Sequence, residues 1–262
     1  NQLCQEYQFD CIDVWGTQSG LENMDENGLC CESEDLDECS ICFGDNSTCT
    51  DDCGIINGNN QSMDECGNCD GQELVSVELW SYCYNIETTT ELDLSYNLIT
   101  EIPSEIGNLI NLETLNFSYN QLTGEIPSEI GNLINLTNLQ LYSNQLTGEI
   151  PSEIGNLTNL VRIYLNNNQL TGELPSEIGN LTNLVVLSLG INQLTGELPS
   201  EIGNLTNLEQ LWLYETQLTG EIPPEIGLLT NLTLLILRNN ELAGEIPEEI
   251  CNQGDITPNV SS

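Results

Sequence analysis

The chain has 262 residues, of which 42 are Asp or Glu, two are Arg and none is Lys or His, so the formal net charge is −40. Nucleic-acid binding and anionic-lipid binding are excluded, because both need clusters of cations and only Arg162 and Arg238 are present. Histidine-based catalysis and histidine-ligated metals are excluded because the residue is absent. No run of about 18 apolar residues occurs, so no membrane insertion is expected.

The cysteines are concentrated at the start of the chain. Of the 12, one is Cys251 and the others are Cys4, Cys11, Cys30, Cys31, Cys39, Cys42, Cys49, Cys53, Cys66, Cys69 and Cys83. Such density in a segment poor in large apolar residues is typical of a disulfide framework in an extracellular or cell-surface protein. The spacing of Cys39 with Cys42, and of Cys66 with Cys69, also suits thiolate ligands of a metal ion, which remains the alternative.

From about residue 91 the sequence repeats itself. The segments 109–132, 133–156, 157–180, 181–204 and 205–228 align without a gap, and shorter or final copies precede and follow them. Each carries the pattern LxxLxxLxLxxNxLTGE[IL]PxEIG, which is typical of leucine-rich repeats. The pattern predicts a solenoid of about seven repeats of 24 residues, mainly β with a 3₁₀ or irregular convex side, preceded by a disulfide-rich irregular module.

One Asn closes most of the repeats. Its copies at 120, 144, 168, 192 and 240 are expected to form a ladder bonded to the backbone, with Thr216 as the exception. The LTGEIPxEIG half resembles the plant-type subclass of these repeats, in which a second short strand and a 3₁₀ turn follow the Pro. This resemblance is specific for the fold and weak for function, because one scaffold serves receptors, inhibitors and structural proteins.

The region before the repeats also shows resemblances. Trp80, Cys83 and the segment TTTELDLSYN resemble the N-terminal cap of such solenoids, while DECSICFGDNSTCTDDCG and DECGNCDG resemble acidic modules of large bacterial surface proteins. The oxygens of these modules suit Ca²⁺, with solvated acidic loops as the alternative. The expected ligands are Asp45, Asn46, Asp51, Asp52, Asp64 and Asp70. The expected organisation is a C-terminal-cap-like segment 1–20, the acidic module 21–72, the N-terminal cap 73–90, the repeats 91–252 and a tail 253–262.

Alternation along each strand predicts which side chains face the concave surface. That surface gathers aromatic residues and both cations, a composition found in interface hot spots. The expected contact residues are Tyr142, Arg162, Tyr164, Trp212, Tyr214, Ile236 and Arg238. The alternative is that strands favour aromatic residues regardless of binding.

Two columns of Glu recur on the opposite side, beginning at Glu125 and Glu129. They either stay solvated or share divalent cations, and their regularity gives no acid–base pair, so no enzyme is expected. Sequons for N-glycosylation occur throughout the chain. Those predicted as candidates are Asn46, Asn116, Asn156, Asn180, Asn204 and Asn231.

The two ends of the chain fit one another. Read tail to head, Val260 and Leu3 take leucine positions of the repeat, and the segment bearing Cys4 and Cys11 resembles a plant-type C-terminal cap. Complete pairing of the cysteines of the N-terminal block requires one of them to reach Cys251. These features favour a head-to-tail homopolymer, an extracellular filament whose units each cap the previous solenoid. The alternative is a secreted or surface recognition module that binds a peptide or glycan on its concave face.

Overall fold

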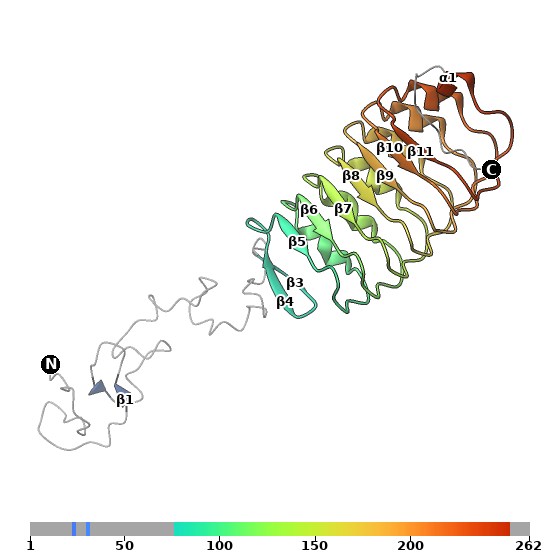
Figure 1. Ribbon diagram of the computed structural model, residues 1–262. Helices are drawn as coiled ribbons and strands as arrows, with labels where there is room; N and C mark the ends of the chain where they lie inside the picture. The colour runs from blue at the N-terminus through green and yellow to red at the C-terminus, as the bar shows by residue number, and fades with distance from the viewer. Residues whose placement is uncertain (1–22, 25–29, 32–75, 252–262) are drawn as a thin grey trace, which may run out of the picture. The chain divides into compact units, whose positions relative to one another are not determined.

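The computed structural model describes residues 23–24, 30–31 and 76–251, and the chain divides into two compact units, 1–74 and 75–262 (Figure 1). In the first unit, β1 (Asn23–Met24) pairs antiparallel with β2 (Cys30–Cys31). Several predicted sites lie outside the described residues. These are the six calcium ligands Asp45, Asn46, Asp51, Asp52, Asp64 and Asp70, and the seam residues Leu3, Cys4, Cys11 and Val260.

The second unit is a solenoid in which each repeat forms one turn, here called a rung. Each rung contributes one short strand, and the seven strands form a single parallel sheet in sequence order. The strands are β5 (Glu91–Asp93), β6 (Thr114–Asn116), β7 (Asn138–Gln140), β8 (Arg162–Tyr164), β9 (Val186–Ser188), β10 (Gln210–Trp212) and β11 (Leu234–Ile236). The predicted leucine-rich repeat solenoid is therefore confirmed.

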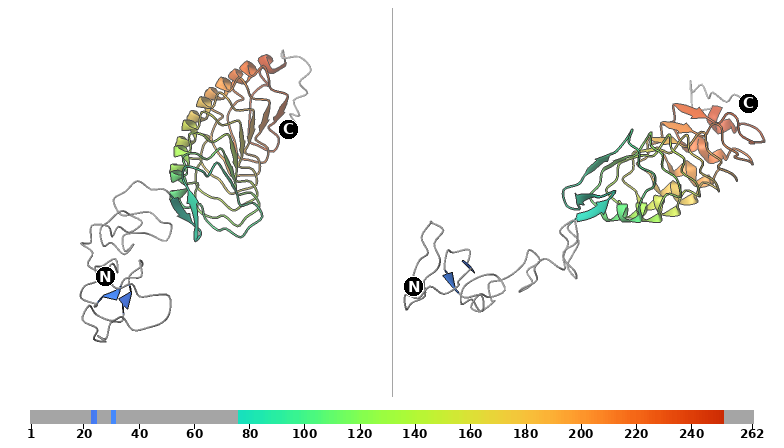
Figure 2. Two further views of the ribbon diagram at one scale, coloured as in Figure 1. Left: turned by 90° about the vertical axis from the view of Figure 1, so that its left-hand side faces the viewer. Right: turned by 90° about the horizontal axis from the view of Figure 1, so that it is seen from below.

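A 3₁₀ helix follows the Pro of each of the first six rungs, as predicted, and a short α-helix follows the Pro of the last. The helices are η1 (Ser104–Asn108), η2 (Ser128–Asn132), η3 (Ser152–Asn156), η4 (Ser176–Asn180), η5 (Ser200–Asn204) and η6 (Pro224–Leu228), and α1 (Glu248–Cys251) follows β11. Figure 2 shows these helices along the outer side of the curved stack and the sheet along its inner side. Cys251 of the predicted seam is the last residue of α1.

The prediction of a second strand after the Pro is wrong within residues 76–251. There, neighbouring rungs are joined before the Pro by backbone hydrogen bonds such as Thr147 N to the Gly124 carbonyl (2.8 Å), and one isolated bridge pairs Glu221 with Ala243. The Gly of the LTG segment adopts a left-handed conformation, with φ of 74° at Gly148, which turns the chain out of this ladder before it can extend.

The consensus apolar residues of each rung fill the interior. In the rung that contains β7 they are at most 4% exposed, and they are Leu133, Leu136, Leu139, Leu141, Leu146, Ile150 and Ile154. The same positions in the neighbouring rungs are buried as well, so one continuous apolar core runs along the stack. Because each rung buries its leucines against its neighbours, no rung has an apolar core of its own.

The predicted Asn ladder is present and joins adjacent rungs. Asn144 Oδ1 accepts hydrogen bonds from the backbone amides of Asn120 and Leu122, each 3.1 Å away. Its Nδ2 donates to the carbonyl of Phe117 (2.9 Å) in the previous rung and to that of Leu141 (3.0 Å) in its own rung. The ladder thereby satisfies backbone groups that the turn leaves without sheet partners.

Thr216 interrupts the ladder, as the sequence predicts. Its hydroxyl donates to the carbonyl of Leu213 (3.3 Å) and lies within hydrogen-bonding distance of Asn240 Oδ1. A hydroxyl is shorter than a carboxamide and carries a single proton, so Thr216 supplies fewer bonds between rungs than the Asn residues do.

An antiparallel hairpin precedes the first rung. It consists of β3 (Ser76–Leu79) and β4 (Tyr82–Asn85), and Cys83 is disulfide-bonded. Val77 and Leu79 are buried in the core, so the hairpin covers the apolar end of the stack. The N-terminal cap at 73–90 stays a prediction, and this hairpin is the part of the structure that corresponds to it.

Candidate functional site

The strands lie in exact register, so their outward residues form columns across the sheet. One column runs through Glu91, Thr114, Asn138 and Arg162, and the next runs through Asp93, Asn116, Gln140 and Tyr164. Residues between these columns, such as Leu115 and Leu139, are buried. The sheet face therefore displays the variable side chains of each rung, as strand alternation predicts.

A hollow of about 610 Å³ lies on this face over β7 to β10 and is here called the sheet groove. It is lined by Asn138, Gln140, Tyr142, Arg162, Tyr164, Asn166, Ser188 and Trp212. The structure thus brings together four of the seven predicted contact residues, namely Tyr142, Arg162, Tyr164 and Trp212. Tyr214, Arg238 and Ile236 belong to the next part of the same face, on and after β10 and β11.

Two polar atoms of the groove are buried without a hydrogen-bond partner. They are the side-chain carbonyl oxygen of Asn138 and the indole N–H of Trp212. A buried polar atom without a partner costs about 1–3 kcal/mol, so native structures rarely retain one without a reason. Both atoms are inaccessible to solvent, so they lie beneath the surface of the groove and a ligand does not reach them in this conformation.

Aromatic rings extend from the groove along the sheet face. Tyr142 meets Tyr164 edge to face, with 6.2 Å between ring centroids, and also meets Tyr119 at 5.1 Å. Tyr119 stacks on Tyr96 at 4.4 Å, and both rings are substantially exposed, at 42% and 74%. A row of exposed rings across consecutive rungs is unusual for a surface that contacts only water.

Tyr119 and Tyr96 were not among the predicted contact residues. Each is the middle residue of a Ser-Tyr-Asn segment that follows a strand. The backbone is left-handed at both, with φ of 54° at Tyr119 and 55° at Tyr96. The prediction considered only positions that flank the strand leucines. The twofold occurrence of SYN is the sequence signal that could have found them.

The position of Tyr214 depends on Gly190 in the preceding rung. A Cβ atom at Gly190 would lie 2.5 Å from a carbon of the Tyr214 ring. Corresponding positions in other rungs carry Ser118, Tyr142 and Asn166. Gly190 therefore leaves the space in which the Tyr214 ring lies, next to Trp212 at 6.4 Å between ring centroids.

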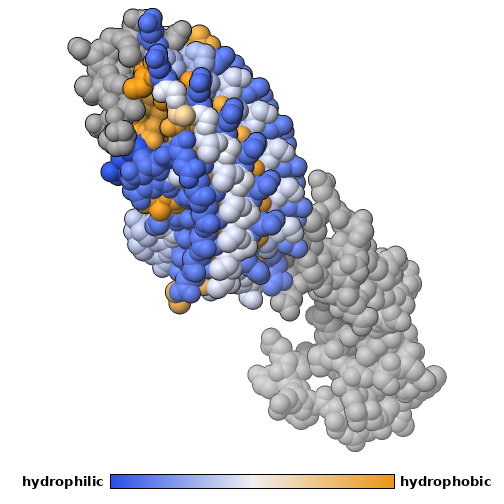
Figure 3. All heavy atoms as spheres, turned by 90° about the vertical axis from the view of Figure 1, so that its right-hand side faces the viewer, coloured by the Kyte–Doolittle hydropathy of each residue, from blue (hydrophilic) through white to orange (hydrophobic). Residues whose placement is uncertain are grey.

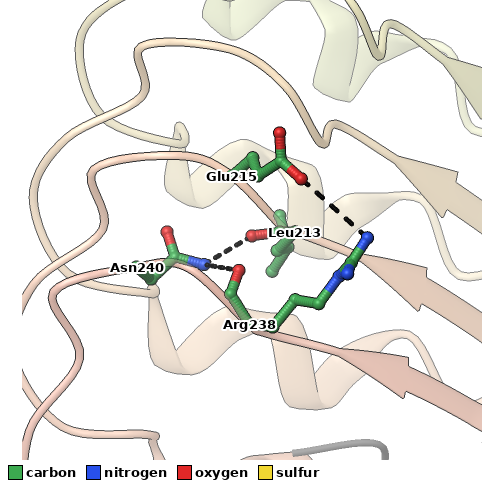
Figure 4. Close-up of polar contacts among 4 residues, drawn as sticks. All are labelled: Leu213, Glu215, Arg238 and Asn240. Carbon is green, nitrogen blue, oxygen red and sulfur yellow. Dashed lines mark hydrogen bonds and ion pairs between the residues drawn. The ribbon is translucent and has the colours of Figure 1, made fainter. Parts of the chain in front are cut away.

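The two cations of the chain differ in their surroundings. Arg238 pairs with Glu215 at 3.9 Å (Figure 4). Its guanidinium also lies 5.3 Å from the centre of the Tyr214 ring. Arg162 is exposed in the sheet groove and forms no ion pair with any residue in the range 76–251. Arg162 therefore presents a guanidinium that the described part of the chain does not neutralise.

Two groups near the N-terminal end of the face have shifted pKa values. Partial burial acts to raise the pKa of Asp93, but hydrogen bonds from the amide and hydroxyl of Ser95 and from Asn116 outweigh it and lower the pKa. Loss of water, followed by the neighbouring phenols of Tyr119 and Tyr142, raises the pKa of Tyr96. These shifts favour the carboxylate of Asp93 and the neutral phenol of Tyr96 at this end of the face.

Both predicted Glu columns lie away from the sheet groove: the column that begins at Glu125 precedes the Pro of each rung, and the column that begins at Glu129 lies in the first turn of the 3₁₀ helices. Glu149, Glu153, Glu173 and Glu197 are exposed, and together with Glu221 they line a broad depression. Within the described residues no three acidic or Cys side chains are arranged to hold a metal ion. Figure 3 shows the resulting surface as parallel hydrophilic and intermediate rows that follow the stacking direction.

The predicted glycosylation sites fall in different environments. Asn156, Asn180 and Asn204 are exposed at the ends of consecutive 3₁₀ helices. Asn116 lies on the sheet face, where its side chain bonds Asp93 and Ser118, and Asn231 donates to the carbonyl of Thr206 at 2.8 Å. N-glycosylation stays a prediction. Asn156, Asn180 and Asn204 form an exposed row and are the most accessible of the candidate sites. Asn46 lies outside the described residues.

Two family models match the solenoid. One, described as a leucine-rich repeat region, matches residues 130–253, and another, described as a leucine rich repeat, matches residues 87–146. No curated protein matches the chain. In the part of the chain that the structure describes, no helix is long and apolar enough to cross a membrane.

Several solved structures are similar to the solenoid. The ectodomain of the Arabidopsis thaliana receptor kinase GASSHO1/SCHENGEN3, solved with CASPARIAN STRIP INTEGRITY FACTOR 2, is 42% identical with a TM-score of 0.58 over 59% of this chain and 18% of its own. The Arabidopsis receptor kinase HAESA, solved with the peptide hormone IDA and the co-receptor SERK1, is 38% identical with a TM-score of 0.61 over 63% of this chain and 28% of its own.

A bacterial structure shows comparable similarity. A leucine-rich repeat protein of Leptospira interrogans is 43% identical with a TM-score of 0.56 over 63% of this chain and 40% of its own. The chain thus spans between 18% and 40% of the length of these three proteins. The repeat pattern, the parallel sheet with its Asn ladder and these matches agree, and residues 87–253 of this chain are leucine-rich repeats.

Proposed function

We propose that the chain is an extracellular recognition module that binds an extended peptide in the sheet groove. The observation that carries this proposal is the sheet groove itself, where the rings of Tyr142, Tyr164 and Trp212 line the same hollow as Arg162, which has no ion-pair partner within residues 76–251. The rings supply large rigid contact areas to an extended peptide.

The comparisons support a binding role in general terms. GASSHO1/SCHENGEN3 and HAESA are receptor kinases, and HAESA was solved with a peptide hormone in place. The similarity covers only part of each receptor, so it supports peptide binding as a class and names no ligand for this chain. A receptor ectodomain also fits the extracellular location that the cysteine content predicts.

The binding test begins with a random 12-residue peptide display library selected against the full chain. Replacing Tyr164 or Trp212 by Ala is expected to weaken the selected peptides about 10- to 100-fold, because central aromatic residues carry most of the energy of such interfaces. The affinities are measured by fluorescence anisotropy with labelled peptides. Thr182→Ala, on the exposed row beyond the 3₁₀ helices, serves as the control and leaves the affinities unchanged.

The opposite results would contradict peptide recognition. If the selection yields no binders, or if binders are insensitive to both aromatic replacements while circular dichroism shows intact folding, the sheet groove is not a peptide site.

A second candidate is the head-to-tail filament, and the open edge of the sheet favours it. β11 is the last strand in the order, and within residues 76–251 no strand pairs with its outer side. Such an edge offers a row of backbone groups to another chain unless something covers it. We propose, as this second function, that another copy of the chain binds at the outer edge of β11. The same contact then repeats from copy to copy without closing into a ring, and the copies build a fibre.

Electron microscopy of the purified chain separates the two candidates. Filaments with a regular axial repeat support the second function. Isolated particles at high protein concentration, in both calcium and chelator, contradict it and leave peptide recognition in place.

A further inference from the structure

The sheet groove lacks carboxylates although the chain carries 42 of them. None of the eight lining residues is acidic, and Arg162 lies among them without an ion-pair partner in the range 76–251. Arg238, by contrast, is already paired with Glu215. The groove thus presents one cation without a carboxylate partner on a strongly negative molecule, and this favours a ligand that places a carboxylate there.

The opposite charge stands at the N-terminal end of the same face. Glu91 and Asp93 are exposed on β5, and Glu91 lies in the same column as Arg162, three strands away. Asp93 is held as a carboxylate by its hydrogen bonds from Ser95 and Asn116. This end favours a basic side chain, and the net charge of the whole chain would speed the approach of a basic ligand.

The separation of the two charges sets a spacing for the ligand. Adjacent strands lie about 4.8 Å apart, so three steps from β5 to β8 span about 14 Å. An extended peptide advances about 3.3 Å per residue, so a peptide laid across the strands covers this span in about four residues.

We infer that the sheet face selects an extended peptide that carries a basic residue and a carboxylate about four residues apart, with the carboxylate on Arg162 and the basic residue between Glu91 and Asp93. The inference rests on the proposed peptide recognition and specifies the chemistry of the peptide. Polyanionic ligands are rejected, because the rest of the chain repels them.

The test uses synthetic peptides of 12 residues with acetylated and amidated ends. Each contains one Lys and one Glu in an otherwise neutral sequence, separated by two, four or seven positions and made in both orders. A further peptide lacks Glu and ends in a free carboxylate four residues after Lys, which distinguishes a terminal carboxylate from a side-chain carboxylate. The peptides with the spacing of four are expected to bind about tenfold more tightly than those with the other spacings.

Matched variants assign the two charges. Arg162→Gln is expected to weaken the best peptide about tenfold and to abolish the preference for spacing, whereas Arg238→Gln changes its affinity less than about twofold, because that guanidinium is already paired. Glu91→Gln combined with Asp93→Asn reduces the advantage conferred by the Lys. Raising the salt concentration weakens binding of the best peptide in the wild-type chain and has less effect in Arg162→Gln.

The outcomes separate this inference from the function on which it rests. Equal affinities at all spacings, or unchanged binding in Arg162→Gln, overturn the charge pairing. If the charge pairing fails but the binding of library-selected neutral peptides still depends on Trp212, the groove recognises peptides without selecting their charges. If no peptide of either kind binds, both proposals fall.

Discussion

Replacing Asn168 by Ala is expected to lower the free energy of unfolding by about 2–4 kcal/mol. Asn168 is 8% exposed and joins two rungs. It accepts from the amide of Leu146 (3.1 Å) and donates to the carbonyls of Leu141 and Leu165 (3.0 Å each). Ala supplies none of these bonds, so the amide of Leu146 is left without a partner, and the carbonyls of Leu141 and Leu165 each keep only one donor, Asn144 and Asn192 respectively. Chemical denaturation followed by circular dichroism measures the loss.

Two further variants check the cause of that loss. Asn180→Ala changes an exposed Asn at the end of η4 and is expected to alter stability by less than about 0.5 kcal/mol. Thr216→Asn restores the missing member of the ladder and is expected to raise stability by about 1 kcal/mol. An Asn168→Ala chain as stable as Asn180→Ala would show that the ladder does not hold the rungs together.

The Gly of the IGN segment is the second position where a small change has a large expected effect. A Cβ atom at Gly179 would lie 2.6 Å from the carbonyl oxygen of Glu201 and 2.7 Å from its Cβ, both in the next rung. The neighbouring 3₁₀ helix cannot move away without opening the core beneath it. Gly179→Ala is therefore expected to cost about 2–3 kcal/mol of unfolding free energy, which thermal or chemical denaturation measures.

Gly124 provides the control for this effect. It has a left-handed backbone with φ of 75°, and a Cβ atom there would meet nothing within 4 Å. Gly124→Ala should therefore cost only the conformational penalty of about 1 kcal/mol. If Gly124→Ala proved the more damaging of the two, the close approach of the rungs would not be the reason for the Gly in IGN.

The regular part of the solenoid could be predicted from the sequence because one physical pattern recurs in every rung. Leu139 and Leu141 are buried, and Asn138 and Gln140 face outward, as alternation along a strand requires. The Asn ladder followed from the same repetition, since an Asn at a fixed place in each turn can bond the same backbone groups each time. The sheet face and four residues of its groove were predicted on this basis.

Features that depend on contacts between different segments could not be predicted in this way. The hairpin turn at Trp80 and Ser81 has φ of 51° and 64°, a conformation that usually needs Asn and Gly. It is held by the Trp80 ring, which meets Phe117 edge to face at 5.2 Å, and by the Trp80 indole, which donates to the Glu101 carbonyl at 3.3 Å. The partnerless atoms of Asn138 and Trp212 likewise depend on the packing of the rings around them.

The position of the sheet groove within the stack has a consequence for its dynamics. In a solenoid each rung contacts only its neighbours, so local unfolding begins at the terminal rungs and moves inward. The groove spans β7 to β10, with β5 and β6 on one side and β11 on the other. Backbone amides under the groove are therefore expected to exchange with solvent more slowly than those of β5 or β11. A fluctuation that opens the β5 end of the molecule leaves the sheet groove assembled, although it disturbs Glu91 and Asp93.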